Sequence, residues 1–242
     1  MGRLLTVSGG IAFVALLVFR FVNGVVAETF ASRLLLFALD QAGYDMADLR
    51  AELFERGYGT LVPVVDHLTN APLDVGFEVA AALLAVTPLV AELVYVVSVR
   101  AIAYDEGGCF PTGRVTDGFV GAYLKSLVAG FVALVLVFIG FALLVIPGII
   151  LAVLFLFVRQ AVVLGGKGTF EALSHSKNLV VENALHVVAL VLLLVVLWGI
   201  LWLVTGFIPV GILVTVLWVA YSVFGIDLVT SAYLQAESPA AV

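Results

Sequence analysis

Six long apolar stretches, separated by shorter polar segments, run along the 242-residue chain. A helix needs about 20 apolar residues to cross a bilayer core about 30 Å thick. Windows of that length predict spans at about 5–26, 75–99, 121–146, 147–164, 184–205 and 209–233. We therefore expect an all-α, polytopic membrane helix bundle, with residues 1–242 forming a single integral membrane domain.

A sharp turn is predicted inside the apolar run Phe138–Arg159, at Pro147 and Gly148. Proline lacks the amide hydrogen that a continuing helix needs, and it is best tolerated in the first turn of a new helix. One span is therefore expected to end near Ile146 and the next to begin at Pro147. A looser copy of this pattern, Ile208–Ile212, predicts a second hairpin with the same orientation, as in a parallel repeat.

The polar segments between the spans predict helices outside the bilayer core. The long acidic segment at about 28–74 is expected to form an external helical lid, with a cap that binds a partner as the alternative. Within it, Asp45 can cap a short helix that Gly57 ends. Two segments, about 112–124 and 169–183, carry polar groups on one side only, which predicts amphipathic helices on the cytoplasmic membrane surface.

Composition agrees with this pattern and adds an expectation about the surroundings. Hydrophobic residues make up 64% of the chain and the mean hydropathy is +1.24, against roughly 45–50% apolar residues in soluble domains. The net charge is −6, with 17 acidic and 11 basic residues. An acidic, lysine-poor surface fits a haloarchaeal, high-salt setting in which charge repulsion is screened; a mesophilic protein with an acidic outer loop is the alternative.

The distribution of basic residues predicts the orientation in the cell membrane, because short loops rich in Lys and Arg stay in the cytoplasm. With the N-terminus inside, the inner side would hold Arg3, Arg100, Arg114, Lys125, Arg159, Lys167 and Lys177, and the outer side Arg33, Arg50 and Arg56. We therefore expect a multi-pass protein with both termini in the cytoplasm.

Ionisable side chains inside the spans are the first candidates for function, because burying a charge in lipid is costly. The predicted spans contain Arg20, Glu78, Glu92, Arg159 and Asp227. A rise of about 1.5 Å per residue places Arg20 and Glu78 together in the outer third, and Glu92, Arg159 and Asp227 in the inner third. The second group predicts an arginine that bridges two carboxylates, either as a structural lock between helices or as a transport site.

Few other residues carry chemistry. Lys125, Lys167 and Lys177 are expected to contact lipid phosphates at the cytoplasmic surface. The sequence contains no phosphate-binding loop, no nucleophile elbow, no metal-ligand spacing and no basic groove, so we expect no cofactor, no metal, no catalytic site and no nucleic-acid partner. The single cysteine, Cys109, excludes an intrachain disulfide.

The order of features from about Arg100 to Val195 resembles a known membrane domain. An apolar span ends in Ile-Pro-Gly at 146–148, a second span and a glycine-containing loop follow, and Phe-Glu-Ala-Leu-Ser-x-Ser occupies 170–176. This order resembles the membrane domain of some glycerophosphodiester phosphodiesterases, and more closely its uncharacterised haloarchaeal integral-membrane relatives. The resemblance implies architecture and no activity, because catalysis in the fused enzymes resides in a separate barrel domain that this chain is too short to include.

These observations predict a non-enzymatic integral membrane protein, a scaffold that contacts membrane lipids and either a protein partner or copies of itself. The first alternative is a small transporter or channel that uses Glu92, Arg159 and Asp227. The second is an enzyme acting on lipid headgroups, for which His175 near the interface would be the reactive group.

Overall fold

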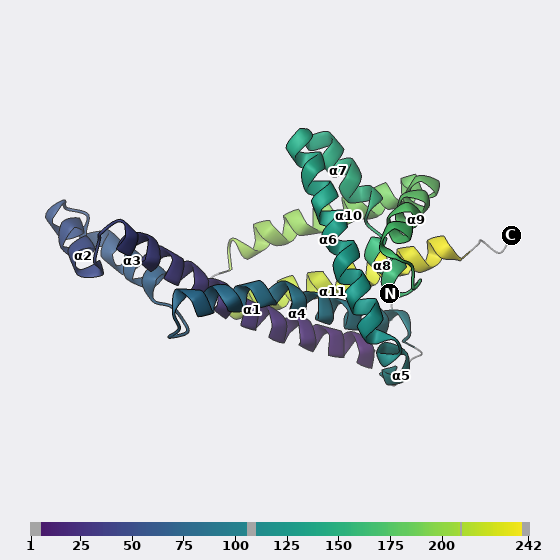
Figure 1. Cartoon of the computed structure of the whole chain (residues 1–242), viewed down its shortest axis with the longest axis horizontal. Helices are drawn as coiled ribbons and strands as arrows, with labels where there is room; N and C mark the ends of the chain where they lie inside the picture. Colours follow the sequence, from purple (N-terminus) through teal and green to yellow (C-terminus); the bar gives the residue numbers. More distant parts are fainter. Residues whose placement is uncertain (1–5, 106–109, 209, 239–242) are drawn as a thin grey trace. The chain divides into compact units, whose positions relative to one another are not determined.

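The computed structural model describes residues 6–105, 110–208 and 210–238, and within them every regular element is a helix (Figure 1). The described part contains six helices or helix pairs that are long and apolar enough to cross a bilayer: α1 (Val7–Gln41), α4 (Phe77–Ala103), α6 (Phe119–Leu143), α7 with α8 (Val145–Val163), α10 (Ala184–Thr205) and α11 (Gly211–Glu237). The all-α prediction is confirmed, and the chain is a multi-pass membrane protein. Arg3, Cys109 and Pro209, on which predictions were made, lie outside the described residues.

The chain divides into two compact units, Val18–Val90 and Met1–Leu17 with Ala91–Val242. In the first unit, α1 and α4 lie side by side, since the Phe77 ring stacks on Phe30 and Phe37 with centroid distances of 5.7 and 5.0 Å. Arg33 donates a hydrogen bond to Asp74, just before α4, at 3.0 Å. Aromatic stacking and one ion pair therefore hold the two helices together at this level.

The first helix is longer than the predicted span. We expected the span to end near residue 26 and the lid to begin near 28, but α1 continues without a break to Gln41. Its 35 residues correspond to about 52 Å, well beyond a bilayer core. The segment after residue 26 contains acidic residues but no glycine or proline before Gly43, whose φ of +77° ends the helix. Charge alone therefore did not mark the helix end.

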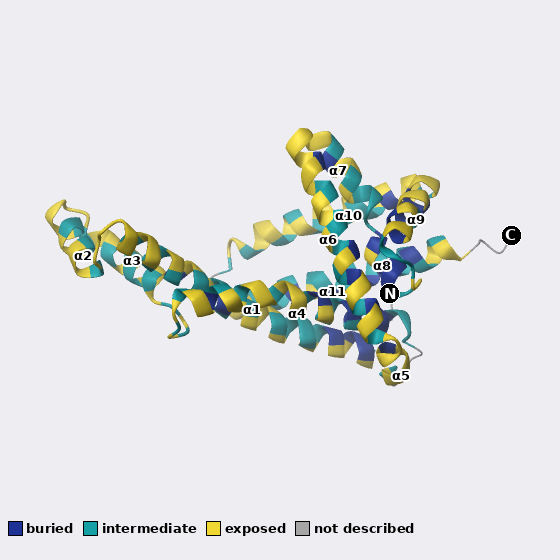
Figure 2. Cartoon of the chain, in the orientation of Figure 1, coloured by how far each residue is buried: buried dark blue, intermediate teal, exposed yellow. Residues whose placement is uncertain are grey.

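The lid helices follow the sequence closely. The predicted short helix is α2 (Met46–Glu55), where the Asp45 carboxylate accepts a hydrogen bond from the Met46 amide and Gly57 has a φ of +81°. A 3₁₀ turn, η2 (Gly59–Leu61), leads into α3 (Val62–Thr69). Arg50 joins α2 to Asp66 of α3 through an ion pair of 2.7 Å. Neither helix has a buried residue, as Figure 2 shows, so ion pairs and backbone caps hold this hairpin rather than a core.

Pro88 lies inside α4, and the helix continues past it. A proline removes the amide that would bond to the carbonyl four residues earlier, here that of Leu84. The Thr87 hydroxyl donates to this carbonyl at 2.7 Å. A neighbouring side chain thus satisfies the backbone group that the proline leaves free, as a membrane helix requires.

The hairpin between α6 and α7 turns earlier than predicted, at Leu144, which has extended φ and ψ of −163° and 149°. Pro147 and Gly148 are not the turn itself: they lie in the first turn of α7, where proline costs no intrahelical bond. Gly148 instead lets the helices approach, since a Cβ built on Gly140 would lie 3.0 Å from the Gly148 Cα. The glycine serves packing between helices, which spacing along the sequence does not show.

The predicted surface helix at about 112–124 is wrong in its extent. A single turn, α5 (Thr112–Thr116), is followed by Gly118 with a φ of +56°, and Phe119 already begins α6. The left-handed glycine separates the short helix from the span. The buried Arg100 holds this loop by donating to the carbonyls of Val115 and Asp117 at 3.0 and 2.6 Å.

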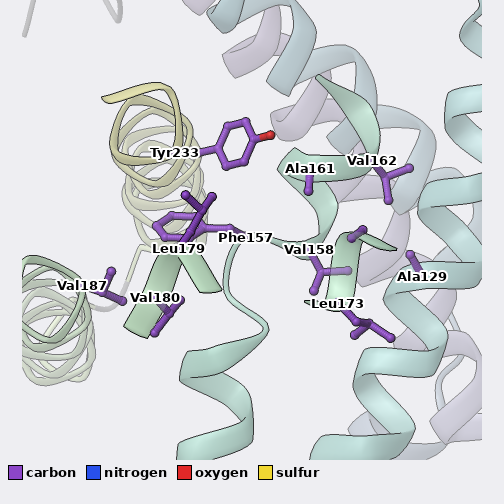
Figure 3. Close-up of a cluster of buried hydrophobic side chains, with 11 residues drawn as sticks. Ala129, Phe157, Val158, Ala161, Val162, Leu173, Leu179, Val180, Val187 and Tyr233 are labelled. Carbon is purple, nitrogen blue, oxygen red and sulfur yellow. The ribbon is translucent and has the colours of Figure 1, made fainter. Parts of the chain in front are cut away.

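The main core of the second unit forms around α9 (Thr169–Glu182), whose bounds agree with the predicted helix at 169–183. One side of α9 is buried through Ala172, Leu173, Ser176, Leu179 and Val180, while Phe170 on the other side is 80% exposed. Figure 3 shows Leu179 and Val180 beside Phe157, with Tyr233 of α11 next to them. The segment predicted to carry polar groups on one side is therefore a helix whose apolar side packs into the core of the second unit.

Candidate functional site

The fourth span is discontinuous. The helix α7 (Val145–Leu154) ends before Phe155–Phe157, and α8 (Val158–Val163) begins after it, although no glycine or proline lies in the interruption. The hydroxyl of Ser176, on α9, donates to the Leu154 carbonyl at 2.7 Å and accepts from the Phe157 amide at 3.1 Å. Irregular backbone is tolerated at membrane depth where protein groups satisfy it. Ser176 supplies those groups from outside the span.

Replacing Ser176 with alanine is expected to lower the free energy of unfolding by about 1–2 kcal/mol, because two buried backbone groups lose their partner. The neighbouring Ser174 is exposed, so Ser174→Ala is a matched control that should change stability by less than about 0.5 kcal/mol. Thermal unfolding of both variants in detergent tests this. Equal midpoints for the two variants would contradict the role given to Ser176.

An ion pair lies next to this interruption. Arg159 Nη2 is 3.1 Å from Glu92 Oε2, and the Glu92 side chain is 5% exposed while that of Arg159 is 44% exposed. The Ser126 hydroxyl, on α6, donates a hydrogen bond to the other Glu92 oxygen. The arginine also lies 4.9 Å above the centre of the Tyr95 ring, a cation–π arrangement. Three helices, α4, α6 and α8, thus meet at one carboxylate.

Three residues of this site were missed by the sequence analysis: Ser126, Tyr95 and Gln160. Gln160 is buried and donates to the Tyr95 hydroxyl at 2.9 Å. Their side chains are uncharged, so a search for ionisable groups in spans passes over them. Tyr95 lies three residues after Glu92 and therefore on the same helix face, which is the signal that could have found it.

Asp227 is buried, but the structure does not bring it into the predicted bridge. No ion pair joins Arg159 to Asp227 among the described residues, and Asp227 Oδ1 is a buried atom without a hydrogen-bond partner. The reason lies in the direction of the side chains. Asp227 belongs to the buried stripe of α11, whereas Arg159 is the exposed position of an otherwise buried α8.

The second predicted pair lies at different levels of its unit. Glu78 is exposed in the first turn of α4, next to Phe77, which stacks on α1 between Phe30 and Phe37. Arg20 lies ten residues before Phe30 on α1, which corresponds to about 15 Å along the helix axis. Because Phe77 lies between Phe30 and Phe37, the neighbouring Glu78 and Arg20 lie at different heights along α1.

The predicted lipid-contacting lysines have different surroundings. Lys125 and Lys177 are exposed, whereas Lys167 is half-buried with its Nζ 4.0 Å from Glu237 Oε1. The same carboxylate oxygen lies 2.7 Å from His175 Nε2. Glu237 therefore joins α9 and the loop before it to the end of α11, and His175 takes part in a contact between helices.

Residues 77–241 match the family described as a domain of unknown function, DUF7847. No curated protein and no solved structure matches the chain. The matched segment contains Glu92, Ser126, Arg159 and Ser176, and with them the interrupted span and its ion pair. Because the match covers more than half of the 242 residues, the chain belongs to the DUF7847 family.

Proposed function

We propose that this protein is a non-enzymatic scaffold of the cell membrane, which contacts lipids and either partner proteins or copies of itself. The observation that carries the proposal is the saturation of Glu92. One of its oxygens pairs with Arg159 and the other accepts from Ser126, so both oxygens of the buried carboxylate have a partner within the protein and join three helices. A buried carboxylate held in this way acts as a lock on helix packing.

The exposed side of α9 supplies a surface for the proposed contacts. Phe170, Val181 and the basic Lys177 lie on it, a mixture of apolar and positively charged groups that suits lipid headgroups or a partner at the cytoplasmic interface. With both termini in the cytoplasm, as the distribution of Arg and Lys predicts, this surface faces the cell interior.

The acidic, lysine-poor composition supports a high-salt, haloarchaeal setting. The order of spans supports kinship with the phosphodiesterase-associated membrane domain.

A small transporter is the second candidate, and one observation favours it. Helices interrupted within the membrane are typical of substrate and ion sites in transporters. Here the interruption at Phe155–Phe157 lies beside Arg159. Transport would require the Arg159–Glu92 pair to open, whereas a scaffold keeps it closed.

Two experiments test the proposal. Chemical cross-linking in native membranes, with a cysteine placed at Lys177, is expected to capture a defined partner or a second copy of the chain.

In proteoliposomes, the wild-type protein is expected to show no flux of protons or small solutes above empty vesicles. A flux that is lost in the combined variant Glu92→Gln, Arg159→Gln, Asp227→Asn would overturn the scaffold proposal in favour of transport.

A further inference from the structure

One buried carboxylate of the second unit, that of Asp227, forms no ion pair with any of the described residues. Asp227 is 7% exposed, and its Oδ1 atom is enclosed without a hydrogen-bond partner. The arginine expected to neutralise it is paired with Glu92. Leaving an ionised carboxylate alone in a low-dielectric interior costs several kcal/mol, so the folded state requires either a proton or a cation at this group.

Thr230 adds a second unsatisfied oxygen on the same side of α11. It lies three residues after Asp227, nearly one helical turn, and both belong to the buried stripe of this helix. Thr230 is 0% exposed, and its Oγ1 has no hydrogen-bond partner. Other helical hydroxyls behave differently and donate to the carbonyl four residues earlier: Thr29, Ser98, Thr205, Thr215 and Ser222. The Thr230 hydroxyl is therefore not used by its own helix.

The chemistry of these two oxygens indicates the ligand. Carboxylate and hydroxyl oxygens are hard donors that prefer hard cations to soft metals. One carboxylate is neutralised by a single positive charge, whereas a divalent ion would leave an excess charge in the bundle. We propose that Asp227 and Thr230 bind a monovalent alkali cation, Na⁺ or K⁺, within the helix bundle.

Gln160 is the residue of α8 that could add a third oxygen. Its amide nitrogen donates to Tyr95, while its Oε1 is buried without a partner. The segment that carries it packs against α11, since the rings of Phe157 and Tyr233 lie 6.0 Å apart (Figure 3). An alkali cation with several oxygen ligands would join these two elements of the core.

The test measures thermal unfolding of the purified protein in NaCl, KCl and N-methyl-D-glucamine chloride at equal ionic strength. A cation present at tenfold its dissociation constant is expected to raise the Tm by about 3–6 °C relative to the organic cation. The near-isosteric Asp227→Asn variant should lose this response. Glu182→Gln, which neutralises an exposed carboxylate at the end of α9, is the matched control and should keep it.

A second variant keeps the test informative if Asp227→Asn does not fold. Thr230→Val retains the shape of the side chain, and it is expected to need at least about tenfold more cation for the same shift in Tm. Equal Tm values of the wild type in all three salts would overturn the proposal, as would an unchanged response in a folded Asp227→Asn. Either outcome leaves the proposed scaffold function standing, because that proposal rests on the Glu92–Arg159 pair and is tested by cross-linking at Lys177.

Discussion

Replacing Gly148 with alanine is expected to lower the free energy of unfolding by about 3 kcal/mol, the upper end of the cost of overpacking a helix contact. A Cβ at this position would lie 2.4–2.7 Å from three atoms of the Phe141 ring. Either the ring must leave its position or α6 and α7 must separate, and both changes lose packing in the hairpin. Detergent unfolding followed by circular dichroism measures the loss.

Two variants identify the cause of this loss. Gly199, inside α10, has no heavy atom within 4 Å of a built Cβ, so Gly199→Ala should be neutral or stabilise by up to about 1 kcal/mol. Adding Phe141→Ala to Gly148→Ala removes the ring and should restore at least half of the lost stability, a measurable coupling. If Gly148→Ala unfolds at the same point as Gly199→Ala, the close approach of α6 and α7 does not exist.

Replacing Arg159 with methionine is expected to lower the free energy of unfolding by about 2–3 kcal/mol. Removing one partner of a fully buried pair costs about 3–5 kcal/mol, while an exposed pair is worth at most about 1 kcal/mol. The pair here lies between these limits, because Glu92 is buried and Arg159 is 44% exposed. The same unfolding measurement tests this, and removal of the arginine leaves Glu92 with Ser126 alone.

The double variant Glu92→Gln, Arg159→Met separates the lost charge pair from a general loss of packing. Glutamine keeps an oxygen that can accept from Ser126 and carries no charge, so the double variant should be more stable than Arg159→Met alone. Arg56→Met, which breaks the more exposed pair with Glu52 on α2, is the control and should cost about 0.3–0.5 kcal/mol. A double variant less stable than Arg159→Met would exclude an uncompensated charge on Glu92.

Hydropathy predicted the spans well because the length of an apolar run reflects the thickness of the bilayer directly. The fifth span was predicted to the residue, and the cap and end of the lid helix followed from Asp45 and Gly57. The end of α1 was missed because acidic residues such as Glu28 and Asp40 indicate that the chain has left the membrane, but they do not end a helix. Polarity indicates where lipid ends, whereas the end of α1 is marked by Gly43 and its positive φ.

The candidate site was predicted only in part because depth along a span does not give direction around a helix. Depth alone grouped Glu92, Arg159 and Asp227, yet Arg159 is partly exposed and pairs with Glu92, while Asp227 is buried and forms no ion pair with a described residue. The interruption at Phe155–Phe157 carries no local breaker in sequence. The interruption is held by hydrogen bonds from Ser176, a residue of another helix. Such contacts between distant segments exist only in the folded protein and leave no local pattern in the sequence.

The two hydrogen bonds that Ser176 makes with the interrupted fourth span have a consequence for the order in which the protein folds. The residue that completes the backbone of the fourth span is made 19 residues after Phe157 and 22 after Leu154. Until α9 has been made and has docked, the Leu154 carbonyl and the Phe157 amide lack the partner that Ser176 supplies. The span therefore reaches its final form only after the following helix has emerged and docked, which couples the order of biogenesis to the order of the chain.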